Sequence, residues 1–138
     1  AFLIVGYGVG RLLETRHYAS IRMRERELLS VVALNTRYVP EGVHALSATV
    51  VSGSVVVSSD YFKTFVAGFR NLIGGRFRGY ETLLERARRE ALLRMKQQAR
   101  DVGSPLVIGV RFHTTRVAGS QTPSVEVLAY GTALLTGP

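Results

Sequence analysis

The stretch ALSATVVSGSVVVSS, residues 45–59, decides the fold class because β-branched and small residues dominate it. Such residues favour extended backbone, so residues 46–51 and 54–58 are predicted to form two strands. Ser52 and Gly53 stand between them and are typical of a tight hairpin turn. Asp60, directly after the stretch, has the side chain of a helix N-cap. The sequence therefore changes from strand to helix at residue 60.

Two helices are expected after Asp60. The first has apolar residues at helical spacing, namely Phe62, Phe65, Val66, Phe69, Leu72 and Ile73. Gly74 and Gly75 are predicted to end it. The second runs from about Tyr80 to Val102, with Leu83, Leu84, Ala87, Ala91, Leu92, Met95 and Ala99 on one face. Gly103 closes it and Pro105 prevents its return.

The chain ends in two runs that are typical of strands, residues 106–117 and 123–135, joined by the turn-rich segment AGSQTP. Upstream, residues 11–30 are predicted to form a helix, and VVALNT a short extended piece. The order β-β-α-α-β-β predicts an α+β fold, an antiparallel sheet with two helices on one face, preceded by an N-terminal helix. Residues 1–30 are expected to be an attachment and residues 31–138 the domain.

The amino-acid composition excludes several kinds of functional site. The chain has 138 residues, a net charge of +8 and no Cys, which excludes disulfides, thiolate metal sites and cysteine nucleophiles. Most positive charge lies in residues 1–40 and 63–101, where solvated helix faces are the simplest interpretation. Aromatic residues do not interleave with the basic ones, so we expect no nucleic-acid partner.

The N-terminal segment AFLIVGYGVGRLL, residues 1–13, is apolar up to Arg11. It is shorter than the roughly 20 apolar residues that span a bilayer. Arg11, Arg16, Arg22, Arg24 and Arg26 follow, as on the cytoplasmic flank of a membrane anchor. The segment is predicted to be the exit end of an anchor at the cytoplasmic face of the inner membrane. The alternative is a buried element followed by an exposed helix.

Catalytic patterns are absent from the sequence. His17, His44 and His113 lie far apart, although distant ligands or symmetry-related chains could still converge on a metal. No serine stands in a nucleophile elbow, and no glycine-rich run matches a phosphate loop. We therefore expect a protein that is not an enzyme and carries no cofactor.

One candidate binding site remains, at the predicted turn between the two helices. Gly74 and Gly75 free the backbone there, and Arg76, Arg78, Tyr80 and Glu81 follow at the start of the next helix. Backbone amides and arginines at a helix N-terminus are suited to a small anion. An ordinary helix–helix turn, with Arg76 paired to a neighbouring acid, explains the residues equally well.

The same segment carries a family resemblance. The pattern F-x-A-G-F-R-N-L-I-G-G-R-x-x-x-Y-E, Phe65 to Glu81, is similar to the signature of the YbjQ-like proteins. The likeness continues through ARREALLRMKQQARDVGSPLVIGVRF and VEVLAYGTAL, and upstream into residues 45–59, so it covers about residues 34–136. Residues 1–30 resemble the membrane-proximal extension of longer members.

The resemblance implies a dodecin-like subunit that assembles with copies of itself into a ring, typically a pentamer or two stacked pentamers. The family is often labelled heavy-metal-binding, a label to which this Cys-free sequence lends little support. The expected function is a homo-oligomeric module tethered to the membrane. The alternative is a metal- or small-anion-binding protein, with its site at Gly74–Arg78 or at a subunit interface.

Overall fold

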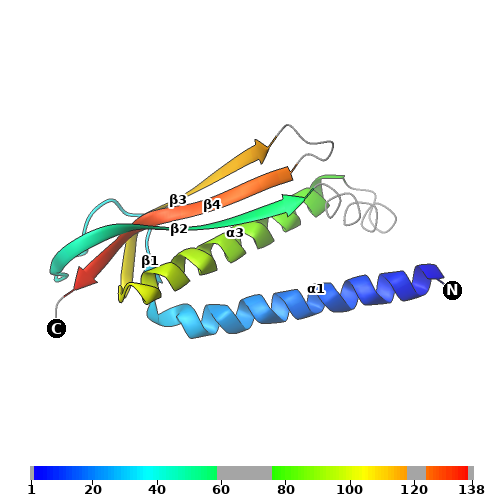
Figure 1. The fold of residues 1–138 in the computed structure, drawn as a ribbon, viewed down its shortest axis with the longest axis horizontal. Coiled ribbons are helices and arrows are strands. Elements are labelled where there is room, and N and C mark those ends of the chain that lie inside the picture. Colours follow the sequence, from blue (N-terminus) through cyan, green and yellow to red (C-terminus); the bar gives the residue numbers. More distant parts are fainter. Residues whose placement is uncertain (1, 59–75, 118–123, 137–138) are drawn as a thin grey trace.

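The protein is an α+β domain preceded by an N-terminal helix, which confirms the predicted fold class (Figure 1). The computed structural model describes residues 2–58, 76–117 and 124–136. Its elements are α1 (Phe2–Glu27), the 3-10 turn η1 (Leu28–Ser30), β1 (Val32–Ala33), β2 (Ala45–Ser58), α3 (Arg76–Asp101), β3 (Leu106–Val117) and β4 (Ser124–Thr136). The helix predicted between Asp60 and Gly74 lies outside the described residues.

The described strands form one four-stranded sheet in the order β1-β3-β4-β2. The long strands β2 and β3 both pair antiparallel with the central β4. The two-residue β1 pairs parallel with β3, so the sheet is not wholly antiparallel as predicted. The two C-terminal strands, β3 and β4, confirm the prediction to within one residue at their ends.

The hairpin predicted at Ser52-Gly53 is wrong. β2 is one continuous strand of 14 residues, and Gly53 lies opposite Ala129 of β4 in its middle. A Cβ on Gly53 would lie 2.5 Å from the Met95 nitrogen and would also meet the Ala91 carbonyl oxygen. Glycine is present because α3 crosses β2 closely at this point, and not because the chain turns.

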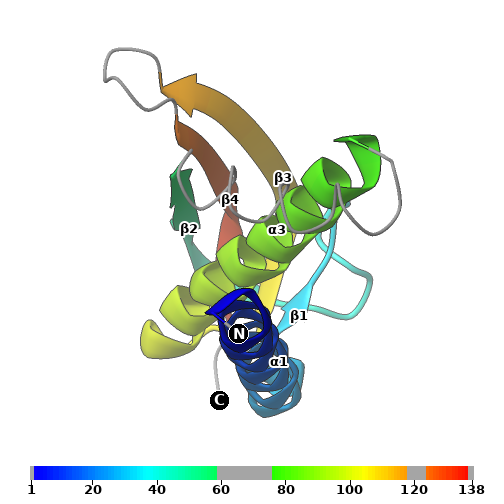
Figure 2. The same ribbon diagram turned by 90° about the vertical axis from the view of Figure 1, so that its right-hand side faces the viewer.

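α3 covers one face of the sheet and forms the core with it (Figure 2). Val51, Val107 and Val127 from the sheet and Ala91 and Met95 from the helix are almost completely buried. Small alanines on α3 let the helix approach the strands, and the valines fill the space between them. Among the described residues, α3 is the helix on this face, and the second predicted helix falls outside them.

α3 begins at Arg76, four residues before the predicted start at Tyr80. Its end agrees with the prediction. The helix stops at Asp101, and Gly103 has a φ of 82°, in the left-handed region that favours glycine. The Ser104 N–H then donates to the Ala99 carbonyl at 2.8 Å, which satisfies a carbonyl of the last turn.

α1 forms a further layer on the outer side of α3 (Figure 1). It is longer than the predicted 11–30 helix because it begins at Phe2. Ile21 of α1 and Leu28 of η1 pack with Leu93 of α3 in a small buried cluster. No helix in the described part of the chain is both long and apolar enough to cross a membrane.

Candidate functional site

The predicted anion site lies at the boundary of the described residues, at the start of α3. Gly74 and Gly75 lie outside the described residues. Arg76, Arg78 and the Tyr80-Glu81 pair lie within the first two turns of α3, where only backbone is described. The two arginines are therefore helical residues and do not lie in a turn before the helix. Anion binding at this place stays a prediction.

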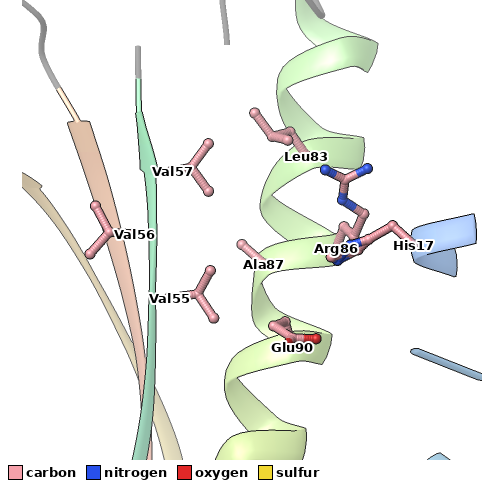
Figure 3. A pocket seen from close by; sticks show the side chains of 8 residues that line it. All are labelled: His17, Val55, Val56, Val57, Leu83, Arg86, Ala87 and Glu90. Atoms are coloured by element: carbon pink, nitrogen blue, oxygen red, sulfur yellow. The ribbon is translucent and has the colours of Figure 1, made fainter. Parts of the chain in front are cut away.

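A cavity of about 390 Å³ lies close by, where α1, β2 and α3 meet (Figure 3). One wall is apolar: Val55 and Val57 point from β2 toward Leu83 and Ala87 of α3, whereas Val56 points to the opposite face of the sheet. The other wall is polar and carries His17 of α1 with Arg86 and Glu90 of α3.

Arg86 is the buried cation of this cavity, with 8% of the residue exposed. Its guanidinium carbon lies 5.6 Å from the centre of the Tyr18 ring, within the range of a cation–π contact. His17 reaches toward Arg86 from α1 (Figure 3). Side chains from two helices therefore bring two cationic or titratable groups to one wall of the cavity.

Glu90 is held by two arginines. Its carboxylate accepts hydrogen bonds from Arg24 Nη1 of α1 at 2.8 Å and from Arg94 Nε of α3 at 3.3 Å. Burial raises the pKa of Glu90, but the hydrogen bond and the charge of Arg24, with the charge of Arg94, outweigh it and leave the pKa below its ordinary value. A carboxylate bound in this way is a poor proton acceptor.

A second ion pair lies beside the first. Arg89 of α3 donates two hydrogen bonds of 2.9 Å to the carboxylate of Glu25 on α1. The hydrogen bond from Arg89 lowers the pKa of Glu25 and raises that of Arg89. The two ion pairs hold α1 against α3 in a defined register, and both carboxylates accept charge-assisted hydrogen bonds.

Metal ligands do not gather in the part of the chain that the structure describes. No group of three or more His, Asp or Glu side chains there could hold a metal ion. His44 is exposed in the loop before β2, His113 is exposed on β3, and His17 lies at the cavity.

Two corners of the sheet, here called the bare corners, are exposed in the part of the chain that the structure describes. The first half of β2, Ala45–Val50, and the second half of β3, 111–116, are exposed along their whole length. A strand that packs on one face would alternate between buried and exposed residues, so neither face of these segments is covered by the described residues. The two segments lie at opposite ends of the sheet (Figure 1).

Two side chains of α3 form hydrogen bonds with backbone groups in the middle of β2, on the edge away from β4. The Ser52 N–H donates to Gln98 Oε1 at 2.6 Å, and the Ser54 carbonyl accepts from Arg94 Nη1 at 2.7 Å. Ser52 and Ser54 therefore turn their backbone polar groups away from β4, as do the other even-numbered residues of β2 by alternation. At Ala48 and Val50 no described group satisfies that outer edge.

Most of these features could not be predicted from the local sequence. Arg24 and Glu90 are 66 positions apart, and Glu25 and Arg89 are 64 apart, so no spacing rule connects them. The bare corners depend on where α3 ends relative to the strands. One signal was available: residues 45–58 contain no charge and no proline, which is unusual for an exposed edge.

Comparison with known proteins identifies the family of this chain. The sequence profile described as "Putative heavy-metal-binding" of the YbjQ proteins matches residues 31–136. The chain belongs to the YbjQ family. This confirms the resemblance found at Phe65 to Glu81, and the YbjQ match begins just after the N-terminal helix and its 3-10 turn.

Curated relatives of this YbjQ chain carry the name UPF0145 protein. One from Hahella chejuensis is 48% identical over 85 residues, 62% of this chain and 79% of its own. One from Methanoregula boonei is 37% identical over 110 residues, 78% of this chain and 88% of its own. A crystal structure of a protein of unknown function from Pediococcus pentosaceus is similar at 16% identity, with a TM-score of 0.47 over 78% of this chain and 98% of that one.

Proposed function

We propose that this YbjQ protein is a self-assembling module without catalytic activity, whose function depends on a homo-oligomeric ring. A single ring of five copies or two stacked rings is the expected form. The observation that carries the proposal is the pair of bare sheet corners, Ala45–Val50 and 111–116, both exposed on two faces. Natural proteins usually cover the edge strands of a sheet or place charge or proline on them, and β2 contains neither a charged residue nor a proline, which favours contact with another copy.

The apolar content of these surfaces supports the proposal. Leu46 is 75% exposed and Val50 is 74% exposed, both on the first half of β2. Val56, Phe112 and Tyr130 add further exposed apolar area on the same sheet. Removing apolar surface from water contributes about 25 cal/mol per Å² before the entropic costs of association are subtracted, so such side chains favour association once they meet a matching surface.

Light scattering after size-exclusion chromatography tests the assembly. The particle mass in mild detergent is expected to be a multiple of 15.2 kDa and to stay constant over a tenfold dilution. A mass of one chain at every concentration would contradict the proposal.

Attachment to the cytoplasmic face of the membrane is the second part of the proposal. It is supported by the first half of α1, where Ile4, Val5, Val9, Leu12 and Leu13 are exposed. Basic side chains follow on the same helix, which suits an anionic lipid surface. The chain is expected to float with vesicles that contain phosphatidylglycerol, and Leu12→Gln/Leu13→Gln is expected to stay in the dense fraction. Leu29→Gln, at an exposed position beyond α1, is the control, and no flotation of the wild type would contradict attachment.

Ligand binding is the alternative function, and the family description favours it. A metal would bind between copies, and a small anion at Arg76 and Arg78 or in the cavity beside Arg86. Thermal unfolding with Zn²⁺, Ni²⁺, Cu²⁺ or inorganic phosphate is expected to shift upward if such a site exists. An unchanged midpoint with all of them would remove this alternative.

A further inference from the structure

We propose that the cavity between α1, β2 and α3 binds a small aliphatic monocarboxylate, with its carboxylate at Arg86 and its hydrocarbon chain along β2. The inference rests on the ligand-binding alternative above, whose small anion it identifies by chemical class. It is independent of self-assembly, because residues of a single chain line the cavity.

The cavity has the size of a small-molecule site. Its volume is about 390 Å³, and ligand pockets commonly measure about 300–1,000 Å³. Its lining comes from α1, β2 and α3, three elements that are far apart in the sequence (Figure 3). A cavity of this volume is far larger than one water molecule needs, and it can hold a short organic molecule.

The apolar wall provides the place for a hydrocarbon chain. Val55 and Val57 extend from β2 toward Leu83 and Ala87 of α3 (Figure 3). Leu83 and Ala87 are buried, and the two valines pack against the core. These side chains carry no polar atom, so a ligand in contact with them is stabilised by burial of its own CH₂ groups.

Arg86 supplies positive charge at the polar wall. The residue is buried and extends from α3 toward α1, where its guanidinium contacts the Tyr18 ring (Figure 3). A guanidinium carries five N–H donors in one plane, so it can bind both oxygens of a carboxylate alongside its other contacts. Because burial reduces screening by water, such a charge-assisted bond is stronger here than at the surface.

Glu90 limits the charge that a ligand can carry. It lies on the same wall, about one turn along α3 from Arg86, and the arginines that bind it keep it ionised. This carboxylate would repel a ligand with two negative charges more strongly than a ligand with one. A monocarboxylate therefore fits better than a phosphate monoester, which carries about −1.5 to −2 charges at neutral pH.

α1 closes the polar side of the cavity. His17 of α1 lies in the lining, and about two turns farther along the helix the two ion pairs described above hold α1 against α3. The walls are therefore already in place before a ligand enters. A preformed site lowers the entropic cost of binding, so even a small carboxylate can be held.

Isothermal titration calorimetry of the full chain with butanoate, pentanoate and hexanoate tests the site. Affinity is expected to rise about fourfold with each added CH₂ group, as burial along the apolar wall predicts. Hexyl phosphate, a dianion at about pH 8, is expected to bind more weakly than hexanoate, and hexylamine is expected not to bind. Equal binding of hexanoate and hexylamine, or tighter binding of hexyl phosphate, would overturn the proposal.

Variants locate the site. Val57→Phe fills the cavity from β2 and is expected to lose hexanoate binding, whereas Val102→Phe adds the same ring at an exposed position beyond α3 and is expected to bind like the wild type. Arg86→Gln is expected to weaken hexanoate binding at least about tenfold. Circular dichroism checks that each variant is folded, and Val57→Phe decides if Arg86→Gln does not fold. Wild-type affinity in folded Val57→Phe would overturn the proposal.

The outcomes separate this site from the proposals above. If the wild type does not bind hexanoate, the site is overturned, while the particle mass by light scattering still decides self-assembly. A thermal shift with Zn²⁺ or inorganic phosphate but no binding of hexanoate would support a ligand site elsewhere and overturn this one.

Discussion

Gly53 is the position where a single side-chain atom decides whether α3 can lie on β2. The glycine lies under the helix at Ala91 and Met95, and a Cβ there would come within 2.5 Å of the Met95 nitrogen. That nitrogen belongs to the helix backbone, which cannot rotate away as a flexible side chain can. The helix and the strand would have to separate.

Gly53→Ala is therefore expected to lower the free energy of unfolding by about 1–3 kcal/mol, as overpacked core substitutions do. Urea unfolding followed by circular dichroism measures the change. Ser52→Ala is the matched control, because Ser52 is exposed and makes its described hydrogen bond to Gln98 with its backbone. Equal stability of Gly53→Ala and wild type would contradict the close crossing of β2 and α3.

Glu90 and Glu25 make similar hydrogen bonds in different surroundings. Glu90 is 6% exposed, and the side chain of Glu25 is 37% exposed. Glu90→Gln leaves Arg24 and Arg94 without their buried anion, and it is expected to destabilise the protein by about 1–3 kcal/mol. Glu25→Gln is expected to cost at most about 1 kcal/mol. Urea unfolding compares the two, and a larger effect at Glu25 would contradict the assignment.

At the residue scale, the sequence predicted contacts between neighbours in the chain better than contacts between residues far apart in it. The capping role of Gly103 was readable because the helix and its end are adjacent in sequence. The partners of Glu90 were not, since Arg24 lies 66 positions away. The hairpin predicted at Ser52-Gly53 was wrong because a Ser-Gly pair occurs both in tight turns and beneath a crossing helix, and the local sequence does not distinguish the two.

At the scale of elements, α1 and α3 are joined by two carboxylates whose folded-state pKa values lie below their ordinary values. Their contribution to stability is complete above the unfolded-state pKa of about 4.3. It is lost as the pH falls from there through the lower folded-state values, because protonation then removes both ion pairs.

The free energy of unfolding is consequently expected to fall progressively as the pH drops below about 4. The double variant Glu25→Gln/Glu90→Gln is expected to start from a lower stability and to show a shallower fall over the same range. Urea unfolding at a series of pH values measures both slopes. An equally steep fall in the double variant would assign the acid sensitivity to other groups.

The elements themselves were largely predictable. Helix periodicity gave α3 and strand composition gave β3 and β4, and the signature at Phe65 to Glu81 gave the family. The start of α3 was placed too late, because Gly79 within RFRGYE is typical of a boundary in sequence but lies inside the helix. The sequence predicted two short strands in place of β2, because Gly53 was assigned to a turn between them.

At the scale of the whole molecule, two corners of the sheet are exposed in the part of the chain that the structure describes, and the proposed self-assembly would cover them. Ala48→Pro tests this feature without disturbing the fold. The N–H of Ala48 faces the open edge by the alternation along β2, so proline removes a donor that the β4 ladder does not use. The variant is expected to keep the circular dichroism spectrum of the wild type while its assembly is lost.

The most direct test of self-assembly is the sedimentation-velocity mass of the wild type and Ala48→Pro in the same mild detergent. The wild type is expected to sediment as one closed oligomer with a mass several times 15.2 kDa, and Ala48→Pro as a single folded chain. A wild type that sediments as one chain of 15.2 kDa at all concentrations would contradict the claim that this protein functions by self-assembly.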